Sequence, residues 1–454
     1  MATTEQRGHW GSRIGFILAA AGSAIGLGNI WKFPYIAGEN GGGFFVLIYL
    51  ACIAFVGLPI MIAEILIGRS TQKSPVGAFK GLYKPNSPWI GVGWLGVASA
   101  FVILSFYSVV AGWAMHYVYL SLSGVFAEFE PGYTGQIFDD LFANPGLNAF
   151  WHILFMGIVM SVVIAGVHKG VERWSEILMP MMLGMLLILF GSALTLSGFQ
   201  EAVAFVFSPA TENLTRAGVL EALGHSFFTL SLGMGAMITY GSYLRTKDDA
   251  VKSSVLIALF DTGIALLACL VLFPITFTYG LEASAGPGLV FVSLPIAFSQ
   301  MPGGTMLATV FFALLTFAAV TSGISLLEVA TAYFIDEKGW SRKRAVCVTG
   351  GGIILLGLPS AMSGGTRLFG EGMSELIGRN WFELFDYLAS NWMLPLGGLG
   401  IAVFMAWRVG HQAREQAFKA GTTWGRLYFG WIYLLRYLVP IAVLAIFLHA
   451  IGLL

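Results

Sequence analysis

The chain has 454 residues and a formal net charge of zero, from 24 Lys and Arg against 24 Asp and Glu. Hydrophobic residues make up 57% of it and charged residues 11%, with a mean hydropathy of +0.79, whereas an ordinary soluble domain is about 25% charged. This composition excludes a soluble globular enzyme, a disordered chain and, because no basic excess would neutralise phosphates, a nucleic-acid-binding protein. An all-α membrane protein with many spans remains.

Eleven apolar stretches reach the length of about 20 residues that a membrane-spanning helix needs. They lie near 14–37, 44–67, 92–123, 149–167, 177–199, 219–243, 253–279, 305–335, 345–361, 381–407 and 427–454. The first is too long for the hydrophobic part of a signal peptide, so we expect it to stay as a membrane helix. A shorter run, 289–301, contains Pro295 and is predicted to be a re-entrant or surface helix.

The basic residues predict the orientation of these spans. Cytoplasmic loops of membrane proteins carry an excess of Lys and Arg. Of the 24 basic residues, 19 lie in alternate connecting segments, namely 1–13, 68–88, 166–176, 244–252, 336–345 and 408–426. We therefore expect the N-terminus in the cytoplasm and, with eleven spans, the C-terminus outside.

Two spans are poor helices in their middle. Span 1 reads AAGSAIGLGN over 20–29, and span 6 reads SFFTLSLGMG over 226–235. In lipid, unwound backbone survives only beside a cavity, where its free carbonyl and N–H groups can hold a cation or a carboxylate. Close packing through small residues is the alternative for either span alone. If spans 1–5 and 6–10 are two repeats, the breaks are equivalent, and the pair predicts a binding site between them at the membrane midplane.

Four acidic residues fall in or near the spans, where a charge is costly and usually faces a cavity or a partner. They are Glu64, Asp261, Glu328 and Asp386. Asp261 stands among wholly apolar neighbours and is interpreted as a cation ligand or a proton carrier; a protonated acid bonded to a neighbouring helix is the alternative. Thr321 and Ser322 add hydroxyls to span 8, although such hydroxyls often bond only to their own helix.

The assembled motifs resemble the neurotransmitter:sodium symporter family, specifically its bacterial amino-acid branch. The motifs are GSAIGLGNIWKFP (22–34), ENGGG (39–43), GVERWSEILMP (170–180) and FFTLSLGMGAMITYGSY (227–243). The resemblance implies 11 transmembrane helices in one domain, 1–454, with a 5+5 inverted repeat and broken helices 1 and 6. The repeats would be 14–199 and 219–407, followed by helix 11 at 427–454. It also implies a multi-pass protein of the bacterial plasma membrane.

The same resemblance implies a substrate site and two sodium sites, with no other cofactor. The first sodium site would use Ala24, Asn29, Thr229, Asp261 and the substrate carboxylate. The second would use Gly22, Ile25, Ala318, Thr321 and Ser322. The substrate would contact Ala24, Leu27, Gly28, Ile103, Tyr107, Phe228, Thr229, Ser231, Met234, Ser322, Gly323 and Leu326.

The predicted substrate is a hydrophobic L-amino acid, aromatic ones included, imported together with sodium by alternating access. Gly26 lies where amine-transporting relatives carry an aspartate, which argues against a biogenic amine. Apolar walls would leave a charged side chain without compensation. Chloride-dependent relatives have Asn at the Asp261 position and a hydroxyl at the Ala265 position, so we expect no chloride requirement. Asp261 could also carry a proton on the return step, with Glu328 and Glu64 as rival carriers.

Two gates are implied by matching positions, with a surface ion pair of little energetic value as the alternative for each. The outer gate would pair Lys32 with Asp386. The inner gate would pair Arg7 with Asp336, and Trp10, Ser242 and Tyr243 would pack the closure. Gly170 and Pro180 suggest a segment of span 5 that unwinds to admit water, with an ordinary proline kink as the alternative.

Three alternatives stay open at this point. A channel would need a continuous polar pore, and an intramembrane enzyme would need a nucleophile–base or metal constellation. The sequence has no HExxH or GxSxG motif, and Cys52, Cys269 and Cys347 show neither metal-binding nor disulfide spacing. The most serious alternative is another sodium- or proton-coupled amino-acid transporter family of the same architecture.

Overall fold

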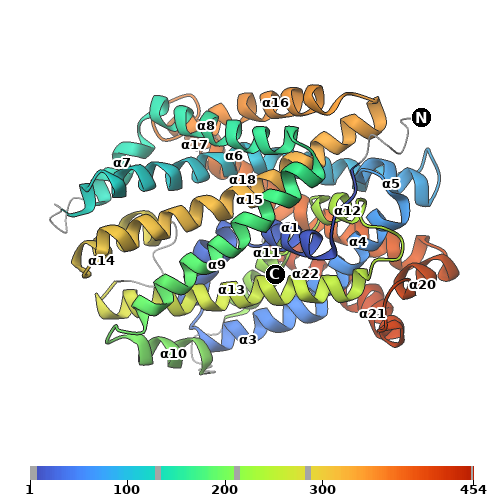
Figure 1. The fold of residues 1–454 in the computed structure, drawn as a ribbon, viewed down its shortest axis with the longest axis horizontal. Helices are drawn as coiled ribbons and strands as arrows, with labels where there is room; N and C mark the ends of the chain where they lie inside the picture. Colours follow the sequence, from blue (N-terminus) through green and yellow to red (C-terminus); the bar gives the residue numbers. More distant parts are fainter. Residues whose placement is uncertain (1–7, 128–133, 209–214, 282–287, 451–452, 454) are drawn as a thin grey trace.

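The computed structural model describes residues 8–127, 134–208, 215–281, 288–450 and 453, and within these ranges every regular element is helical (Figure 1). Short π- or 3₁₀-helical segments are labelled η. The first half contains α1 (Arg13–Ala24), η2 (Gly28–Lys32), α2 (Phe33–Glu39), α3 (Gly43–Cys52), η3 (Ile53–Gly57), α4 (Leu58–Thr71), α5 (Pro75–Leu82), α6 (Ile90–Leu122), η4 (Val125–Ala127), α7 (Thr134–Phe142), α8 (Pro145–Ile164), η5 (Val167–Glu172), α9 (Arg173–Ala193) and α10 (Phe199–Phe207).

The second half begins at the other broken span. It contains α11 (Arg216–Thr229), α12 (Ala236–Gly241), α13 (Ala250–Thr278), η6 (Leu289–Ser293), α14 (Leu294–Gln300), α15 (Gly304–Lys338), α16 (Arg342–Met362), α17 (Glu371–Ile377), α18 (Trp381–Tyr387), η7 (Leu388–Met393), α19 (Leu394–Val403), η8 (Phe404–Arg408), α20 (His411–Lys419), η9 (Gly425–Leu427), α21 (Tyr428–Tyr433), η10 (Leu434–Leu438) and α22 (Val439–Ala450).

Among the described residues, nine helices are long and apolar enough to cross a membrane. They are Gly43–Thr71, Ile90–Leu122, Pro145–Ile164, Val167–Ala193, Ala250–Thr278, Gly304–Lys338, Arg342–Met362, Trp381–Arg408 and Gly425–His449. The pair Arg13–Ala24 and Gly28–Glu39, bent by 51°, makes a tenth span if it is counted as one. The predicted eleventh corresponds to α11 and α12, whose 14 and 6 residues are each too short alone. The count of eleven therefore stays a prediction, although each predicted stretch contains a helix or a broken pair.

Both breaks follow from local backbone chemistry. The first helix, α1, ends at Ala24, just before Gly26 and Gly28. In the other break, between α11 and α12, Ser231, Gly233 and Gly235 all have positive φ angles, of 53°, 78° and 75°. Such angles lie outside the right-handed helical region, so the pattern of i→i−4 hydrogen bonds stops at these residues.

The long helices α6 and α15 form the centre around which the broken helices pack. For α6 and α15, 78% of the apolar window is buried within the protein, against 28% for the last span, Gly425–His449. The broken helix α1 packs against α9, α13 and α15, while α12 packs against α4 and α15. The labels of α1 and α11 accordingly lie near the middle of Figure 1. The shorter apolar run forms the predicted non-spanning helix, Leu289–Gln300.

Candidate functional site

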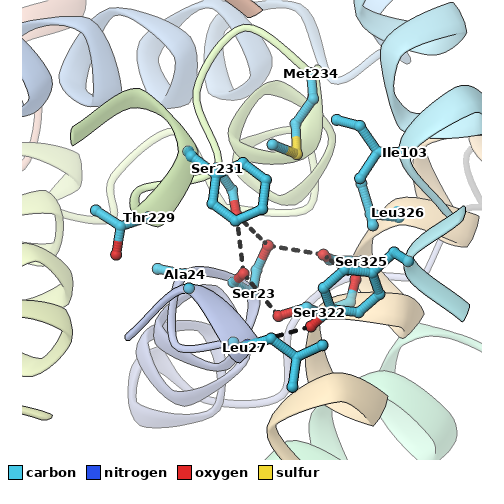
Figure 2. Close-up of a pocket in the computed structure, with 14 residues that line it drawn as sticks. Ser23, Ala24, Leu27, Ile103, Thr229, Ser231, Met234, Ser322, Ser325 and Leu326 are labelled. Carbon is cyan, nitrogen blue, oxygen red and sulfur yellow. Dashed lines mark hydrogen bonds between the residues drawn. The ribbon is translucent and has the colours of Figure 1, made fainter. Parts of the chain in front are cut away.

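A cavity of about 30 Å³ lies where the two breaks meet α6 and α15 (Figure 2). Its lining residues are Ser23, Ala24, Gly26, Leu27, Gly28, Ile103, Tyr107, Phe228, Thr229, Ser231, Met234, Ser322, Ser325 and Leu326. All the predicted substrate residues except Gly323 are among them. Residues more than 300 positions apart in the sequence thus meet at one point of the fold.

The structure corrects the place of Gly323. A Cβ built on this glycine would lie 3.1 Å from side-chain atoms of Phe155 and Val159, so the position faces α8 and not the cavity. Gly323 therefore allows α15 to pack closely on α8. Gly26 has the role of leaving space in the cavity: a Cβ there would lie 2.7 Å from Ser322 Oγ and 3.1 Å from the Tyr107 hydroxyl.

Two serines of the cavity, Ser23 and Ser325, were missing from the predicted set. The Ser23 hydroxyl donates to Ser325 Oγ at 2.7 Å, and the Ser231 hydroxyl donates to the Ser23 carbonyl at 2.8 Å. These bonds join α1, the α11–α12 break and α15, as the dashed lines in Figure 2 show. A signal for Ser325 existed, because it lies three residues after Ser322 and hence on the same face of the helix.

At one wall of the cavity, donors from α6 and from the first break face each other. The Leu27 N–H donates to the Tyr107 hydroxyl at 3.4 Å, and both residues line the cavity. Ile103, Met234 and Leu326 supply apolar surface on the other side, and Figure 2 shows their side chains close together. The cavity therefore has one polar end and one apolar end, the arrangement typical of a site for a small amphipathic molecule.

Asp261 is the centre of a buried polar cluster beside the cavity. Asn29 Nδ2 donates to Asp261 Oδ1 at 2.7 Å, and the Thr229 hydroxyl lies 3.0 Å from the same oxygen. The Tyr49 hydroxyl donates to Asp261 Oδ2 at 3.4 Å. Asn29 Oδ1 accepts from the Gly26 N–H at 3.1 Å, so Asp261 and Thr229 are the predicted side-chain ligands that offer oxygen here as the site stands. Asn29 would have to turn and give up its present bonds to add a third oxygen for a hard cation.

The second predicted cation site is assembled in part. Ser322 Oγ lies 3.4 Å from the Gly22 carbonyl oxygen, and the Thr321 hydroxyl donates to the Ala318 carbonyl at 2.9 Å. A Cβ on Gly22 would lie 3.2 Å from Thr321 Cβ, so this glycine permits α1 to approach α15. Ile25 is fully buried directly after the end of α1. These groups are hydroxyl and carbonyl oxygens from two helices.

The other two buried acids have fixed partners. Glu64 Oε1 accepts a hydrogen bond from the Gly233 N–H at 2.7 Å and thereby holds the α11–α12 break. Glu328 forms an ion pair with Arg342 and accepts from the Tyr243 hydroxyl at 2.6 Å. None of the four predicted acids lines this cavity itself, and Asp261 is joined to it through the Thr229 hydroxyl, which belongs to a lining residue.

Lys32 and Asp386 lie on a second cavity of about 110 Å³, which shares Leu27, Gly28, Tyr107 and Phe228 with the first. Lys32 Nζ lies 5.0 Å from the centre of the Phe228 ring, and Asp386 accepts from the Ser390 hydroxyl at 3.0 Å. In the described part of the chain these two charges face one cavity without forming an ion pair.

The opposite end of the bundle is packed. Trp10 Nε1 donates to the Tyr240 carbonyl at 2.9 Å, and the Trp10 ring lies edge-on to Tyr243. Ser242 is buried beside them. Asp336 accepts from the Ser74 N–H at 2.6 Å, whereas its predicted partner Arg7 lies outside the described residues.

The predicted unwinding segment lies on this side of the molecule as well. Gly170 belongs to η5, a π-helical stretch, and a Cβ there would lie 2.1 Å from the Val162 carbonyl oxygen. Pro180 stands inside α9, where it removes a backbone hydrogen bond. The start of this span is therefore not a regular α-helix.

Comparison with known proteins gives consistent results. The sodium:neurotransmitter symporter family model matches residues 7–131 and 135–453. A sodium-dependent transporter of Bacillus subtilis, YhdH, is 39% identical over 98% of both chains. Another, of Haemophilus influenzae, is 32% identical over 98% of both. The crystal structure of MhsT in complex with L-phenylalanine is 45% identical, with a TM-score of 0.89 and coverage of 98% of this chain and 100% of that one.

Proposed function

The chain belongs to the sodium:neurotransmitter symporter family, and from this premise we propose that it imports hydrophobic, including aromatic, L-amino acids together with sodium. The family consists of transporters, so the protein is a multi-pass membrane transporter and not an enzyme. Membership in this family also excludes the alternative of a different transporter family with the same architecture. The observation that carries the proposal is the cavity between the two breaks, with a polar end beside Asp261 and an apolar end at Ile103, Met234 and Leu326.

The polar end suits an amino acid's backbone groups. A carboxylate placed between the Leu27 N–H and the Tyr107 hydroxyl would accept from both donors. The ammonium group would face carbonyl oxygens freed at the breaks, near Ala24 and Phe228. The apolar end offers no charged side chain, so a lysine or glutamate substrate would lose hydration without a partner. MhsT, the structural relative, was crystallised with L-phenylalanine.

Two sodium ions would couple to this substrate, one at Asp261, Asn29 and Thr229 and one between Gly22 and Ser322. The substrate carboxylate would complete the first site. Sodium and substrate would then strengthen each other's binding by the same factor, because such coupling is reciprocal. In both proposed sites every ligand atom would be an oxygen, which suits a hard monovalent cation.

Transport is proposed to need no chloride. Asp261 supplies a fixed negative charge at the first sodium site, and its neighbour one turn on, Ala265, is buried and has no hydroxyl to hold an anion. In proteoliposomes, uptake should stay nearly constant when chloride is replaced by gluconate. A large loss of rate would contradict this part of the proposal. The proposed location is the bacterial plasma membrane, with the N-terminus in the cytoplasm.

The direct test is binding of radiolabelled tryptophan and leucine to the purified protein, with sodium and with potassium in its place. We expect saturable binding of both amino acids that requires sodium, with competition by phenylalanine and none by lysine. A preference for lysine, recognition of glycine alone, or equal binding in potassium would overturn the proposal.

A further inference from the structure

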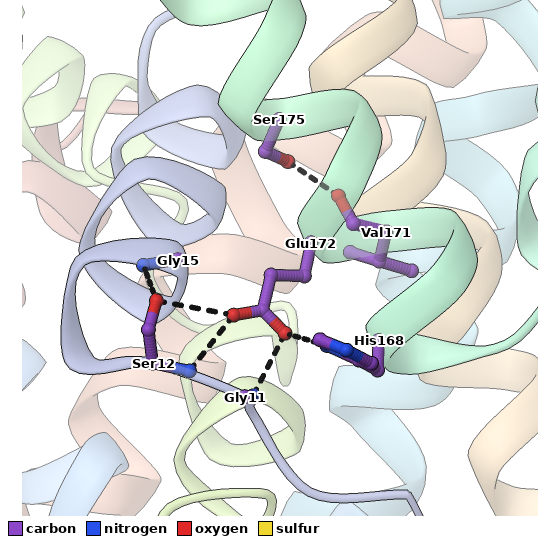
Figure 3. Close-up of polar contacts among 7 residues, drawn as sticks. All are labelled: Gly11, Ser12, Gly15, His168, Val171, Glu172 and Ser175. Carbon is purple, nitrogen blue, oxygen red and sulfur yellow. Dashed lines mark hydrogen bonds and ion pairs between the residues drawn. The ribbon is translucent and has the colours of Figure 1, made fainter.

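One buried carboxylate connects the N-terminal end of α1 to the start of span 5 (Figure 3). Glu172 Oε2 accepts from the Gly11 N–H at 2.8 Å, and Oε1 accepts from the Ser12 N–H at 2.9 Å and the Ser12 hydroxyl at 3.2 Å. Nδ1 of His168, one turn earlier, lies 2.7 Å from Oε2. The Glu172 side chain is 2% exposed, so water has little access to the carboxylate that accepts these bonds.

The residues opposite are shaped to receive this carboxylate. A Cβ on Gly15 would lie 2.1 Å from Glu172 Oε1, and a Cβ on Gly11 would lie 2.5 Å from the His168 ring. Any larger residue at these two positions would displace the carboxylate or the imidazole. The sequence GSRIG at 11–15 therefore provides two glycines for close approach and a serine between them.

Ser12 links this contact to the helix itself. It is the N-cap of α1, and its Oγ accepts from the Gly15 N–H at 2.8 Å while its hydroxyl hydrogen points to Glu172. The first N–H groups of a helix lack partners within the helix, and a negative charge is favourable at this end. Glu172 thus acts as a second cap, provided by another segment of the chain, so that α1 is best capped only while it is held against η5.

We propose that Glu172 is a positioning residue that locks the inner end of α1 onto span 5, and that breaking this contact is a required step of substrate release. The inference rests on the proposed transport function. Both elements that the carboxylate joins are irregular or short: α1 has 12 residues, and η5 is the π-helical start of the span that contains Gly170 and Pro180. Separating them would move Trp10, two residues before Ser12, away from the Tyr240 carbonyl that it bonds in the closed inner end.

The contact between Glu172 and the N-terminal end of α1 should also affect the affinity for sodium. The C-terminal half of α1 carries Gly22, whose carbonyl faces Ser322, and a Cβ on Gly22 would lie 3.2 Å from Met179 Sδ of α9. The helix is therefore held on α9 near the cation site and on η5 at its far end. Weakening the far contact should favour the conformation in which α1 has left α15, and thereby lower the affinity for sodium.

The test measures how often the inner end opens. In a Cys347→Ser background, which removes the exposed cysteine, Ser242→Cys provides a thiol that is buried in the closed inner end. Its reaction rate with a water-soluble maleimide, in sodium and without substrate, is compared for the parent, Glu172→Gln and Glu176→Gln. Glu176 is the matched control, because it is exposed four residues further along the same span, at the start of α9.

Glu172→Gln should raise the reaction rate about tenfold, equivalent to about 1.4 kcal/mol, because a neutral amide oxygen accepts weaker hydrogen bonds than a carboxylate does. It should also raise the sodium concentration for half-maximal substrate binding, with maximal binding retained. Glu176→Gln should change neither quantity. Gly15→Ala should reproduce the effect of Glu172→Gln by displacing a carboxylate that keeps its charge.

Equal reaction rates in the parent, Glu172→Gln and Gly15→Ala would overturn the proposal, as would a uniform loss of binding with no shift in the sodium dependence. If Glu172→Gln does not fold, the Gly15→Ala comparison decides the result. Failure of the proposed function is seen separately, because the parent would then bind no amino acid in a sodium-dependent manner, whatever its thiol reactivity.

Discussion

At the scale of single residues, Asp261 is the buried carboxylate of the proposed first sodium site, beside the proposed substrate cavity. It lies on α13, is completely buried, and is contacted by Asn29 of the first break, Thr229 at the second break and Tyr49 of α3. Three separate segments therefore converge on the carboxylate that a fourth, α13, carries. A buried charge without such partners would be very costly, so the cluster is stable only when it is fully bonded or when it holds a cation.

Asp261→Asn keeps the size of this side chain and removes its charge. We expect the sodium concentration for half-maximal leucine binding to rise at least about tenfold, because the variant loses the Coulombic attraction of a buried carboxylate for the cation, and about 1.4 kcal/mol of it is a factor of ten. The measurement is equilibrium binding of leucine across a sodium titration. Thr276→Val is the control, because this buried hydroxyl of the same helix, α13, donates to the Phe273 carbonyl within that helix. An unchanged sodium curve in Asp261→Asn would remove Asp261 from the coupling site.

Gly26→Ala tests the shape of the cavity. The added methyl would lie 2.7 Å from Ser322 Oγ and 3.1 Å from the Tyr107 hydroxyl, so one of them must move. Such overpacking costs about 1–3 kcal/mol, and we expect substrate affinity to fall about ten- to a hundredfold. Gly184→Ala on α9, where a Cβ meets no atom within 4 Å, should bind normally. Normal binding in Gly26→Ala would place the substrate elsewhere.

The sequence could predict most of the residues of this site, but not all, and the exceptions have a physical reason. A motif gives the positions along the chain, and the helical period then gives the face, which suffices for Tyr107 and Ser322. Gly323 is adjacent to Ser322, and a step of one residue turns about 100° around the helix, so its place depends on how α15 is rotated against α8. That rotation is set by packing between helices, which a single sequence does not contain.

At the scale of elements, the two breaks were predictable as regions and not in detail. Gly233 and Gly235 adopt positive φ angles as glycines do readily. Ser231 also does so, at 53°, and nothing in its residue type indicates this. Its hydroxyl bond to the Ser23 carbonyl compensates for the strained backbone and ties the two breaks together. Similarly, the charges of Lys32 and Asp386 were predictable, whereas their separation depends on how the surrounding helices are arranged.

Pro180→Ala tests the unwinding of span 5. Proline in a helix costs about 3 kcal/mol, so its removal should make the segment between Gly170 and Pro180 harder to open. We expect slower uptake in proteoliposomes, by about tenfold, with unchanged leucine binding at saturating sodium. Pro359→Ala, a helix-internal proline of α16, is the matched control and should transport normally. Faster uptake in Pro180→Ala would show that the proline hinders opening.

At the scale of the whole molecule, the distribution of Lys and Arg predicts the orientation. In a Cys347→Ser background, Glu375→Cys lies in a segment predicted to be external, and Lys84→Cys lies in one predicted to be cytoplasmic; both positions are exposed. A membrane-impermeant maleimide applied to intact cells should label Glu375→Cys alone, and permeabilised cells should show both. Labelling of Lys84→Cys alone in intact cells would reverse the proposed topology.

The shortness of α1 has a mechanical consequence. With 12 residues and a rise of about 1.5 Å per residue, the helix is a lever about 18 Å long. If its pivot is the break beside Ala24, a rotation of about 20° swings the Ser12 end by about 6 Å, while the carbonyls at the pivot shift by about 1 Å or less. The small shift at the pivot is of the size that breaks the coordination of an ion. The same rotation opens a gap as wide as a side chain at the Ser12 end. The long helices α6 and α15, unbroken over 33 and 35 residues, have no such break to act as a pivot.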